Sequence, residues 1–242
     1  MLGLVRAVDA ISSRKDDRDG PLPPLLLVLT FVTGLVDAVS YLKLGHVFVA
    51  NMTGNVVFLG FAVAGAPDFS IPASLVAIAA FLGGALAGGR LASSTGHHRG
   101  RFFAVATLVQ IVLVGAALLV ATMLDLEREA VPYELIVLLA LAMGMQNAAA
   151  RRLGVPDLTT TVLTLTLTGL AADSTLAGGS SPRPGRRMIA TVTMFLGAAV
   201  GTFLVFSVGV SAVLALALAL LILNGTAAYA VSSSSSAWTV GG

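Results

Sequence analysis

Long apolar runs, separated by short connections with polar residues, Gly or Pro, dominate the pattern along the chain. Eight such runs follow one another, at residues 24–44, 47–65, 71–90, 102–124, 133–150, 158–176, 188–209 and 211–231. Most are near the roughly 20 residues that a helix needs to cross a bilayer. They lack the period-two alternation of barrel strands, and backbone groups in lipid must be satisfied within the segment. The pattern predicts an all-α fold, a polytopic transmembrane helical bundle.

Composition agrees with this class. Of the 242 residues, 57% are hydrophobic and 11% charged, too few polar side chains to coat a water-facing globule. The chain has no Cys, which excludes disulfides, thiolate metal sites and Cys nucleophiles. No enzyme motif, nucleotide-binding loop or nucleic-acid module is present. We therefore expect no enzyme, cofactor, metal or nucleic-acid partner. An intramembrane enzyme acting on lipid is the weaker alternative.

The expected organisation is one transmembrane domain between two tails. Residues 1–22 are expected to form a cytoplasmic polar tail of mixed charge without a signal-peptide cleavage site, and residues 23–231 the transmembrane domain. Residues 232–242 form a Ser-rich C-terminal tail, whose low-complexity run Ser232–Ser236 we expect to be mobile. The adjacent His97 and His98 lie in a basic loop. Neighbouring side chains point apart on a regular element, so we interpret that loop as a membrane anchor and not as a metal site.

An internal repeat divides the transmembrane domain into halves of about 23–124 and 132–231. Gly34-Leu-Val-Asp37-Ala38 lines up with Gly144-Met-Gln-Asn147-Ala148, 110 positions later. Phe81-Leu-Gly83 lines up with Phe195-Leu-Gly197, 114 positions later. The similar offsets favour duplication of a four-segment unit, and chance alignment of small and apolar residues is the alternative.

Basic residues distinguish two topologies. Eight full crossings would spread the 14 Lys and Arg residues almost evenly over both sides. If the second and sixth runs enter and return on one side, only Lys43 and Arg128 remain outside. The positive-inside rule favours this arrangement, with a cytoplasmic N-terminus and three crossings in each half. We expect two pseudo-symmetric halves, an inverted 3+3 repeat with a re-entrant or broken segment in each, and keep eight spans as the alternative.

Polar residues within the apolar runs are the candidate chemistry. An ionisable carboxyl such as Asp37, three turns into a span, is a functional candidate by default. Its helix face also carries Tyr41, and we expect it to converge with the matching face of the second half in the bundle interior. The candidate substrate-binding or coupling residues are Asp37, Tyr41, Asn51, Thr53, Asn55, Asn147, Arg151 and Thr164. Alternatively, Asp37 makes a structural hydrogen bond to Asn51, Thr53 or Asn55.

Two pairs of small residues predict close helix packing. Gly83 with Ala87 and Gly197 with Gly201 have the small-xxx-small spacing that lets transmembrane helices approach closely. We expect them to be structural.

The motifs themselves resemble a known family. Gly34-Leu-Val-Asp-Ala-Val-Ser-Tyr41, Asn51-Met-Thr-Gly-Asn55 and Gly144-Met-Gln-Asn-Ala148 with Arg151 are similar to the YoaK-like family, domain of unknown function 1275. The resemblance covers roughly residues 25–230 and implies a small multi-pass protein of the bacterial inner membrane with no established activity. Where that family usually has a second Thr-Gly, Thr164 is followed by Leu165.

Two functions compete. An inverted repeat with broken segments is the arrangement in which transporters build central sites, which predicts a secondary transporter or permease for a small polar or anionic solute. Asp37 would be the coupling or solute-binding carboxyl, with Arg151 as counter-charge. The alternative is a non-transporting membrane scaffold or partner-binding subunit that uses the glycine seams as assembly faces. The expected partners are the lipid bilayer and the solute, and a homo-oligomer is compatible with both functions.

Overall fold

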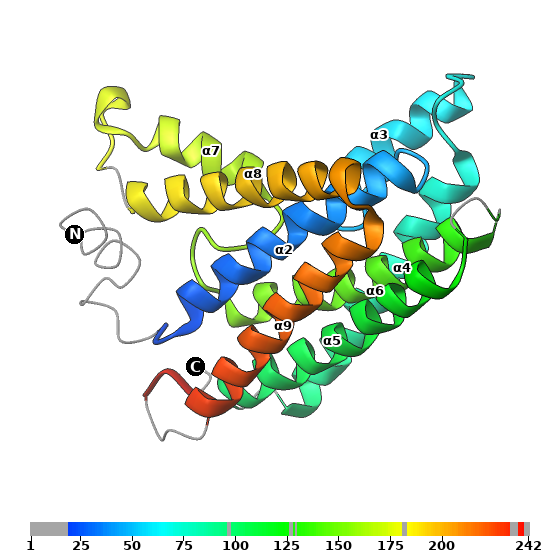
Figure 1. The fold of residues 1–242 in the computed structure, drawn as a ribbon. Helices are drawn as coiled ribbons and strands as arrows, with labels where there is room; N and C mark the ends of the chain where they lie inside the picture. Colours follow the sequence, from blue (N-terminus) through cyan, green and yellow to red (C-terminus); the bar gives the residue numbers. More distant parts are fainter. Residues whose placement is uncertain are drawn as a thin grey trace.

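The structure, a computed structural model, describes residues 19–95, 98–125, 128, 130–180, 183–232 and 237–239. Six long helices dominate the described part (Figure 1): α2 Leu22–Lys43, α4 Ile71–Thr95, α5 Arg99–Met123, α6 Ala130–Leu153, α8 Pro184–Ser207 and α9 Val210–Ser232. The shorter elements are α3 Met52–Val63, α7 Leu163–Ala172 and the 3₁₀ turns η1 Thr175–Ala177 and η2 Ala237–Thr239. The all-α, multi-pass prediction is confirmed.

Helix length separates candidate crossings from the other two apolar helices. The six long helices, of 22 to 25 residues, are long and apolar enough to cross a membrane. With 12 and 10 residues, α3 and α7 span only about 18 and 15 Å at 1.5 Å per residue. Six long segments with one short segment in each half agree with the six-crossing arrangement, and the eight-span alternative loses its support.

The long helices run between two ends of the bundle. The first end, which we call the basic end, holds the ends of α4 and α6 and the starts of α5 and α8. Its described basic residues are Arg90, Arg99, Arg101, Arg151, Arg152, Arg183, Arg186 and Arg187. The start of α2 also lies there, since Asp19 forms ion pairs with Arg99 and Arg186 at 3.6 and 3.4 Å. The opposite end has Lys43 and Arg128.

Two parallel helix pairs pack backbone to backbone through glycines. In the α2–α8 pair, a side chain on Gly197 would collide with the carbonyl of Phe31, and one on Gly34 would lie 2.6 Å from the backbone of Met194. The α4–α6 pair repeats this, with Gly144 against the carbonyl of Phe81. Small residues allow this approach, and in a membrane such packing replaces the hydrophobic effect as a driving force.

The expected seam on α4 is one residue out of register. Gly83 and Ala87 are exposed, whereas Gly84 and Gly88 are buried, and Gly84 faces the carbonyl of Leu141. The residue of α4 that is equivalent to Gly197 of α8 is therefore Gly84 and not Gly83. The offset between the two helices is 113 residues, and not the 114 expected from the alignment. The sequence runs Gly-Gly here, so alignment alone could not choose between them. On α8, the predicted Gly197 lies against the backbone of Phe31, and Gly201 lies against Leu35 and Ala38 of α2.

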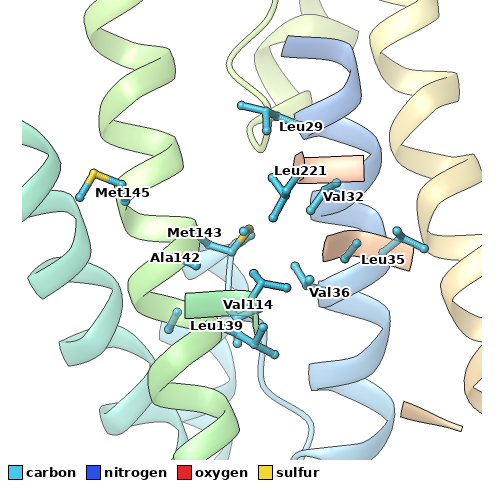
Figure 2. Packing of buried hydrophobic residues seen from close by; sticks show 14 of the residues in the cluster. Leu29, Val32, Leu35, Val36, Val114, Leu139, Ala142, Met143, Met145 and Leu221 are labelled. Carbon is cyan, nitrogen blue, oxygen red and sulfur yellow. The ribbon is translucent and has the colours of Figure 1, made fainter. Parts of the chain in front are cut away.

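Helices α2 and α6 form the centre of the bundle. They are the two most buried of the six long helices, with 72% and 61% of their apolar windows inside the protein. Figure 2 shows Val114 of α5 and Leu221 of α9 between Met143 of α6 and Val32 of α2. The other long helices expose large apolar side chains, such as Leu108 of α5, as lipid-facing helices do.

Part of the C-terminal tail is docked. Trp238 in η2 is 6% exposed and packs against Gly20 and Gly100, where added side chains would lie 2.5 and 3.0 Å from its ring. This contact lies beyond the Ser232–Ser236 run for which we expect a mobile tail, and that expectation stays a prediction. Residues 1–18, 233–236 and 240–242, as well as His97, lie outside the described residues.

Candidate functional site

A small pocket lies at the end of the bundle opposite the basic end. It has a volume of about 250 Å³, and we call it the Asp37 pocket. Its lining residues are Gly34, Asp37, Ala38, Tyr41, Leu42, Phe48 and Asn51, together with Met194, Ala198 and Thr202 of α8. It thus lies where the α2–α8 pair meets the segment that leads into α3.

Asp37 holds this segment in place. One carboxylate oxygen accepts hydrogen bonds from the backbone N–H groups of Val49 and Ala50, at 3.0 and 2.9 Å, and the other accepts one from the side-chain amide of Asn51. The residue is 5% exposed. A buried carboxylate is tolerable when such donors surround it. Both oxygens are therefore already engaged, and the structural interpretation of Asp37 is the one that its contacts support.

Asn51 and Asn55 stabilise the same segment in different ways. Asn51 precedes α3 but makes no capping bond to it, because its amide is turned toward Asp37. Asn55 is fully buried, accepts from the Phe48 N–H at 2.8 Å and donates to the Phe48 carbonyl at 2.6 Å. It therefore shapes the loop and does not line the pocket. Thr53 is exposed and also lies outside the pocket lining.

An aromatic cluster lies at this end of the bundle, beside the Asp37 pocket. Tyr41 stacks on Phe48 with ring centroids 5.2 Å apart, and Phe58 of α3 stacks on Phe69 at 5.1 Å. His46 and Phe61 complete the cluster. These rings connect α2, α3 and the loop before α4, so apolar and aromatic packing holds α3 in place.

A larger pocket opens at the basic end. It has a volume of about 1090 Å³, and we call it the Arg151 pocket. Its lining comes from α4 (Phe81, Ala85, Gly89, Ala92 and Ser93), from α6 (Asn147, Ala148, Ala150, Arg151 and Arg152) and from the following loop (Gly154, Val155, Pro156, Asp157, Thr159 and Val162). In the described part of the chain, Arg151 and Arg152 are exposed and form neither an ion pair nor a side-chain hydrogen bond.

The two pockets use equivalent positions. Asp37 and Tyr41 correspond to Asn147 and Arg151, each 110 positions apart, and all four line a pocket. On the partner helices, Met194, Ala198 and Thr202 of α8 correspond to Phe81, Ala85 and Gly89 of α4, each 113 positions apart. Each pocket is thus built from a glycine-packed helix pair and the segment before a short helix.

The polar contact inside each pocket region is also repeated. The hydroxyl of Thr161 donates to the side-chain oxygen of Asn147 at 2.5 Å, and these residues correspond to Asn51 and Asp37. The Asn147 amide group also donates to the carbonyl of Met143 at 3.0 Å. In each half, one polar side chain on the long helix therefore anchors the segment that precedes the short helix.

Ion pairs hold α7 where aromatic rings hold α3. The Arg187 guanidinium of α8 donates to Asp157 at 2.8 Å and to Asp173 at 2.7 Å, and Arg183 lies 3.8 Å from Asp157. The guanidinium also lies against Gly169, where a side chain would approach within 2.7 Å. The loop that walls the Arg151 pocket is therefore fixed to α8 through charges.

The structure brings the candidate residues together as two groups and not as one. Asp37, Tyr41 and Asn51 line one pocket, Asn147 and Arg151 line the other, and the pockets lie toward opposite ends of the bundle. The expected convergence of Asp37 with Asn147 does not occur in this structure. Thr164, like Thr53, is exposed and lies outside both linings. The two predicted helix faces are separated because each packs against a different partner helix.

Comparison with known proteins gives one family. The profile described as protein of unknown function (DUF1275) matches residues 25–226. The UPF0700 transmembrane protein YoaK of Bacillus subtilis (strain 168) is 37% identical over 150 residues, which cover 62% of this chain. The match spans 65% of that relative, slightly less than two thirds of its length. No solved structure matches the chain.

Proposed function

The chain belongs to the DUF1275 family, and from its two related pockets we propose that this multi-pass membrane protein is a secondary transporter of a small polar or anionic solute. The observation that carries the proposal is the equivalence of the pocket linings at opposite ends of the bundle. Transporters built from inverted repeats reach one solute site from either side by exchanging the conformations of their halves. Related pockets at both ends are what such an exchange requires.

Orientation and repeat symmetry belong to this proposal. The helix pairs α2–α8 and α4–α6 use equivalent glycines but run in opposite directions, which supports an inverted repeat of two halves. The positive-inside rule then assigns the basic end to the cytoplasm, because the opposite end has only Lys43 and Arg128 among the described Lys and Arg residues. In this orientation, for which we propose the bacterial inner membrane, the Arg151 pocket faces the cytoplasm.

The unequal pocket sizes support a state that is open toward the basic end. The Arg151 pocket has a volume of about 1090 Å³ and the Asp37 pocket about 250 Å³, although their helix walls use equivalent positions. If the halves exchange conformations, the Asp37 pocket widens while the Arg151 pocket narrows. The ion pairs of Arg187 would have to rearrange during this step, because they hold the wall of the larger pocket.

Charge favours an anionic solute in the Arg151 pocket. Its acidic residue, Asp157, is already paired with Arg187 and Arg183, which leaves the charges of Arg151 and Arg152 uncompensated within the described residues. Guanidinium groups bind carboxylates and phosphates through paired hydrogen bonds. We assign Arg151 to solute binding. Asp37 is better assigned to positioning, since three donors already occupy its carboxylate.

The scaffold alternative keeps only part of its support. It relied on glycine seams as assembly faces, and Gly197 and Gly201 are covered by α2 of the same chain, whereas Gly83 and Ala87 are exposed on α4. A transporter also accounts for the paired pockets better than an enzyme does, since neither lining contains a nucleophile with an adjacent base or a pair of carboxylates.

A matched pair of cysteine variants tests the proposal. Ala85→Cys and Ala198→Cys place single thiols at equivalent positions of the two pockets in a chain without Cys. In oriented membrane vesicles, an impermeant thiol reagent should label position 85 from the cytoplasmic side and position 198 from the other side. Anions that slow labelling at position 85 then become the candidates for uptake by proteoliposomes. Labelling of both positions from one side would overturn the proposal.

A further inference from the structure

Three amide side chains lie buried near the middle of the long helices. Gln110 of α5 and Gln146 of α6 have no exposed surface, and Asn224 of α9 is 2% exposed. The side-chain oxygens of all three are without a hydrogen-bond partner, as is the side-chain nitrogen of Asn224. A buried polar group without a partner costs about 1–3 kcal/mol, so several at one depth require an explanation.

Helix register places the three amides in one layer. Gln110, Gln146 and Asn224 lie three or four residues from Val114, Met143 and Leu221, which belong to one apolar cluster in Figure 2. One turn along a helix keeps a residue on the same face. Each amide lies about one turn closer to the basic end than the apolar residue with which it is paired. This holds because α5 runs away from the basic end, whereas α6 and α9 run toward it.

Contacts between helices support this register. Gln146 donates to the hydroxyl of Thr33 on α2 at 2.8 Å, which connects α6 and α2 at this depth. On the other side of the layer, a side chain on Gly225, next to Asn224, would lie 3.4 Å from Thr107 of α5. The layer therefore includes α2, α5, α6 and α9, the helices that Figure 2 shows around the apolar cluster.

The layer has an excess of acceptors. The hydroxyls of Thr33 and Thr107 donate to helix carbonyls at 3.0 and 2.9 Å, and the amide groups of Gln146 and Gln110 donate to Thr33 and to the carbonyl of Ala106. These donors are engaged, so among the described groups of the layer three amide oxygens but only one amide nitrogen, that of Asn224, are without a partner. Oxygen atoms without donors suit a cation, and they do not suit an anion.

The type of cation follows from the absence of charge among these residues. The layer offers neutral amide and hydroxyl oxygens, whereas Ca²⁺ and Mg²⁺ are bound through carboxylates and transition metals through imidazole or thiolate. Neutral oxygens at membrane depth are the ligands that replace the hydration shell of alkali cations in channels and transporters. We propose that Gln110, Gln146 and Asn224 form a binding site for a monovalent alkali cation in the centre of the bundle.

This site goes beyond the proposed transport function and does not depend on it. A cation there would satisfy buried oxygens in a protein of any activity. In a transporter, the same position on the four central helices is where a coupling ion would bind.

The first test measures thermal unfolding of the full-length protein purified in detergent. In one series NaCl replaces choline chloride stepwise at constant ionic strength, and in a second series KCl replaces it. No organic solute is added in either series. A ligand that binds the folded state raises its stability, so we expect a saturable increase in Tm on the order of 5 °C. Equal Tm values in Na⁺, K⁺ and choline would overturn the proposal and assign the layer to ordered water. The two proposals fail independently: if no anion binds at the Arg151 pocket, the transport function is contradicted and the cation site is unaffected.

Variants then identify the ligands. Asn224→Leu and, independently, Gln110→Leu remove one amide each with little change in volume, and we expect each to abolish the cation-dependent shift. Ser74→Ala is the matched control, since the Ser74 hydroxyl on α4 is also buried and unpartnered but lies on a helix outside the layer. Retention of the shift in both Leu variants would overturn the assignment.

Broadening of the ²³Na resonance by the unmodified protein tests cation binding without any substitution. An unchanged line width would contradict the proposed site.

Discussion

The side-chain amide of Asn51 donates a hydrogen bond to the carboxylate of Asp37 and thereby ties the segment before α3 to the face of α2. The equivalent residues of the second half, Thr161 and Asn147, form the corresponding contact before α7. The same device thus positions the wall of each pocket. Its chemistry differs between the halves, with a carboxylate that accepts three hydrogen bonds in one and a neutral amide in the other.

Removing the Asp37 carboxylate should destabilise the protein more than neutralising it. Asp37→Ala leaves two backbone N–H groups and one amide buried without acceptors, and we expect a loss of about 2–4 kcal/mol in the free energy of unfolding. Asp37→Asn should lose less than half of this free energy. The remaining amide oxygen can still accept the backbone hydrogen bonds of Val49 and Ala50, and the Asn51 amide can rotate so that its oxygen accepts from the new amide group. Denaturant unfolding in mixed micelles measures both, with Thr53→Ala as the neutral control. Equal losses for Ala and Asn would contradict the hydrogen-bond account.

Neighbouring glycines on α4 should respond differently to a single methyl group. Gly84→Ala would push a Cβ atom into the Leu141 carbonyl, and separating two backbones should destabilise the fold by about 1–3 kcal/mol. In Gly83→Ala, the added Cβ meets only the side chain of Leu141 at 3.5 Å, so its stability should stay within about 0.5 kcal/mol or rise slightly. Thermal unfolding of the two variants decides between the registers, and a larger loss for Gly83→Ala would restore the seam expected from the sequence.

Replacing Arg187 should loosen α7 and leave α3 unchanged. Arg187→Gln removes the ion pairs to Asp157 and Asp173, whereas α3 is held by aromatic rings. Backbone amides of α7 and of residues 155–162 should therefore exchange hydrogen faster in mass spectrometry. Because charges are screened by salt, protection of α7 in the unmodified protein should also fall as ionic strength rises. Equal acceleration in α3 and α7 would point to global destabilisation and not to a local connection.

Loss of one guanidinium in the Arg151 pocket should weaken anion binding. For any anion that binds the purified protein, Arg151→Gln should raise the Kd about 10- to 100-fold, since a charge-assisted hydrogen bond contributes about 1.5–3 kcal/mol. Arg101→Gln is the control, because it removes the same charge at the same end of the bundle from an exposed position outside the pocket lining. Equal effects of both variants would indicate long-range charge attraction without a site.

Several features could be read from the order of residues because they depend on local composition. The eight apolar runs could be located, but those at 47–65 and 158–176 are as long as others that cross, so the distribution of Lys and Arg and not run length distinguished them. The structure then shows that the helices within them, α3 and α7, have only 12 and 10 residues. The correspondence of Asp37 with Asn147 was visible from the repeated motif. Asn51 was among the partners expected for Asp37, because the chain returns toward α2 after a short loop. Even the buried amides had a detectable signal, as Gln110 and Asn224 interrupt otherwise apolar runs.

By itself, the sequence determined the membrane class, the positions of the eight apolar runs and the uneven distribution of Lys and Arg, all of which follow from the chemistry of successive side chains. The tertiary structure alone decided which glycine touches a backbone, that Asp37 and Asn147 line separate pockets, and that Arg187 meets Asp157 and Asp173. Those outcomes depend on helix rotation and on the choice of partner helix. In an apolar chain, a register shift of one residue changes the helix face that packs and the helix it packs against, but leaves composition and hydropathy almost the same. Only the packed bundle therefore distinguishes one register from the next.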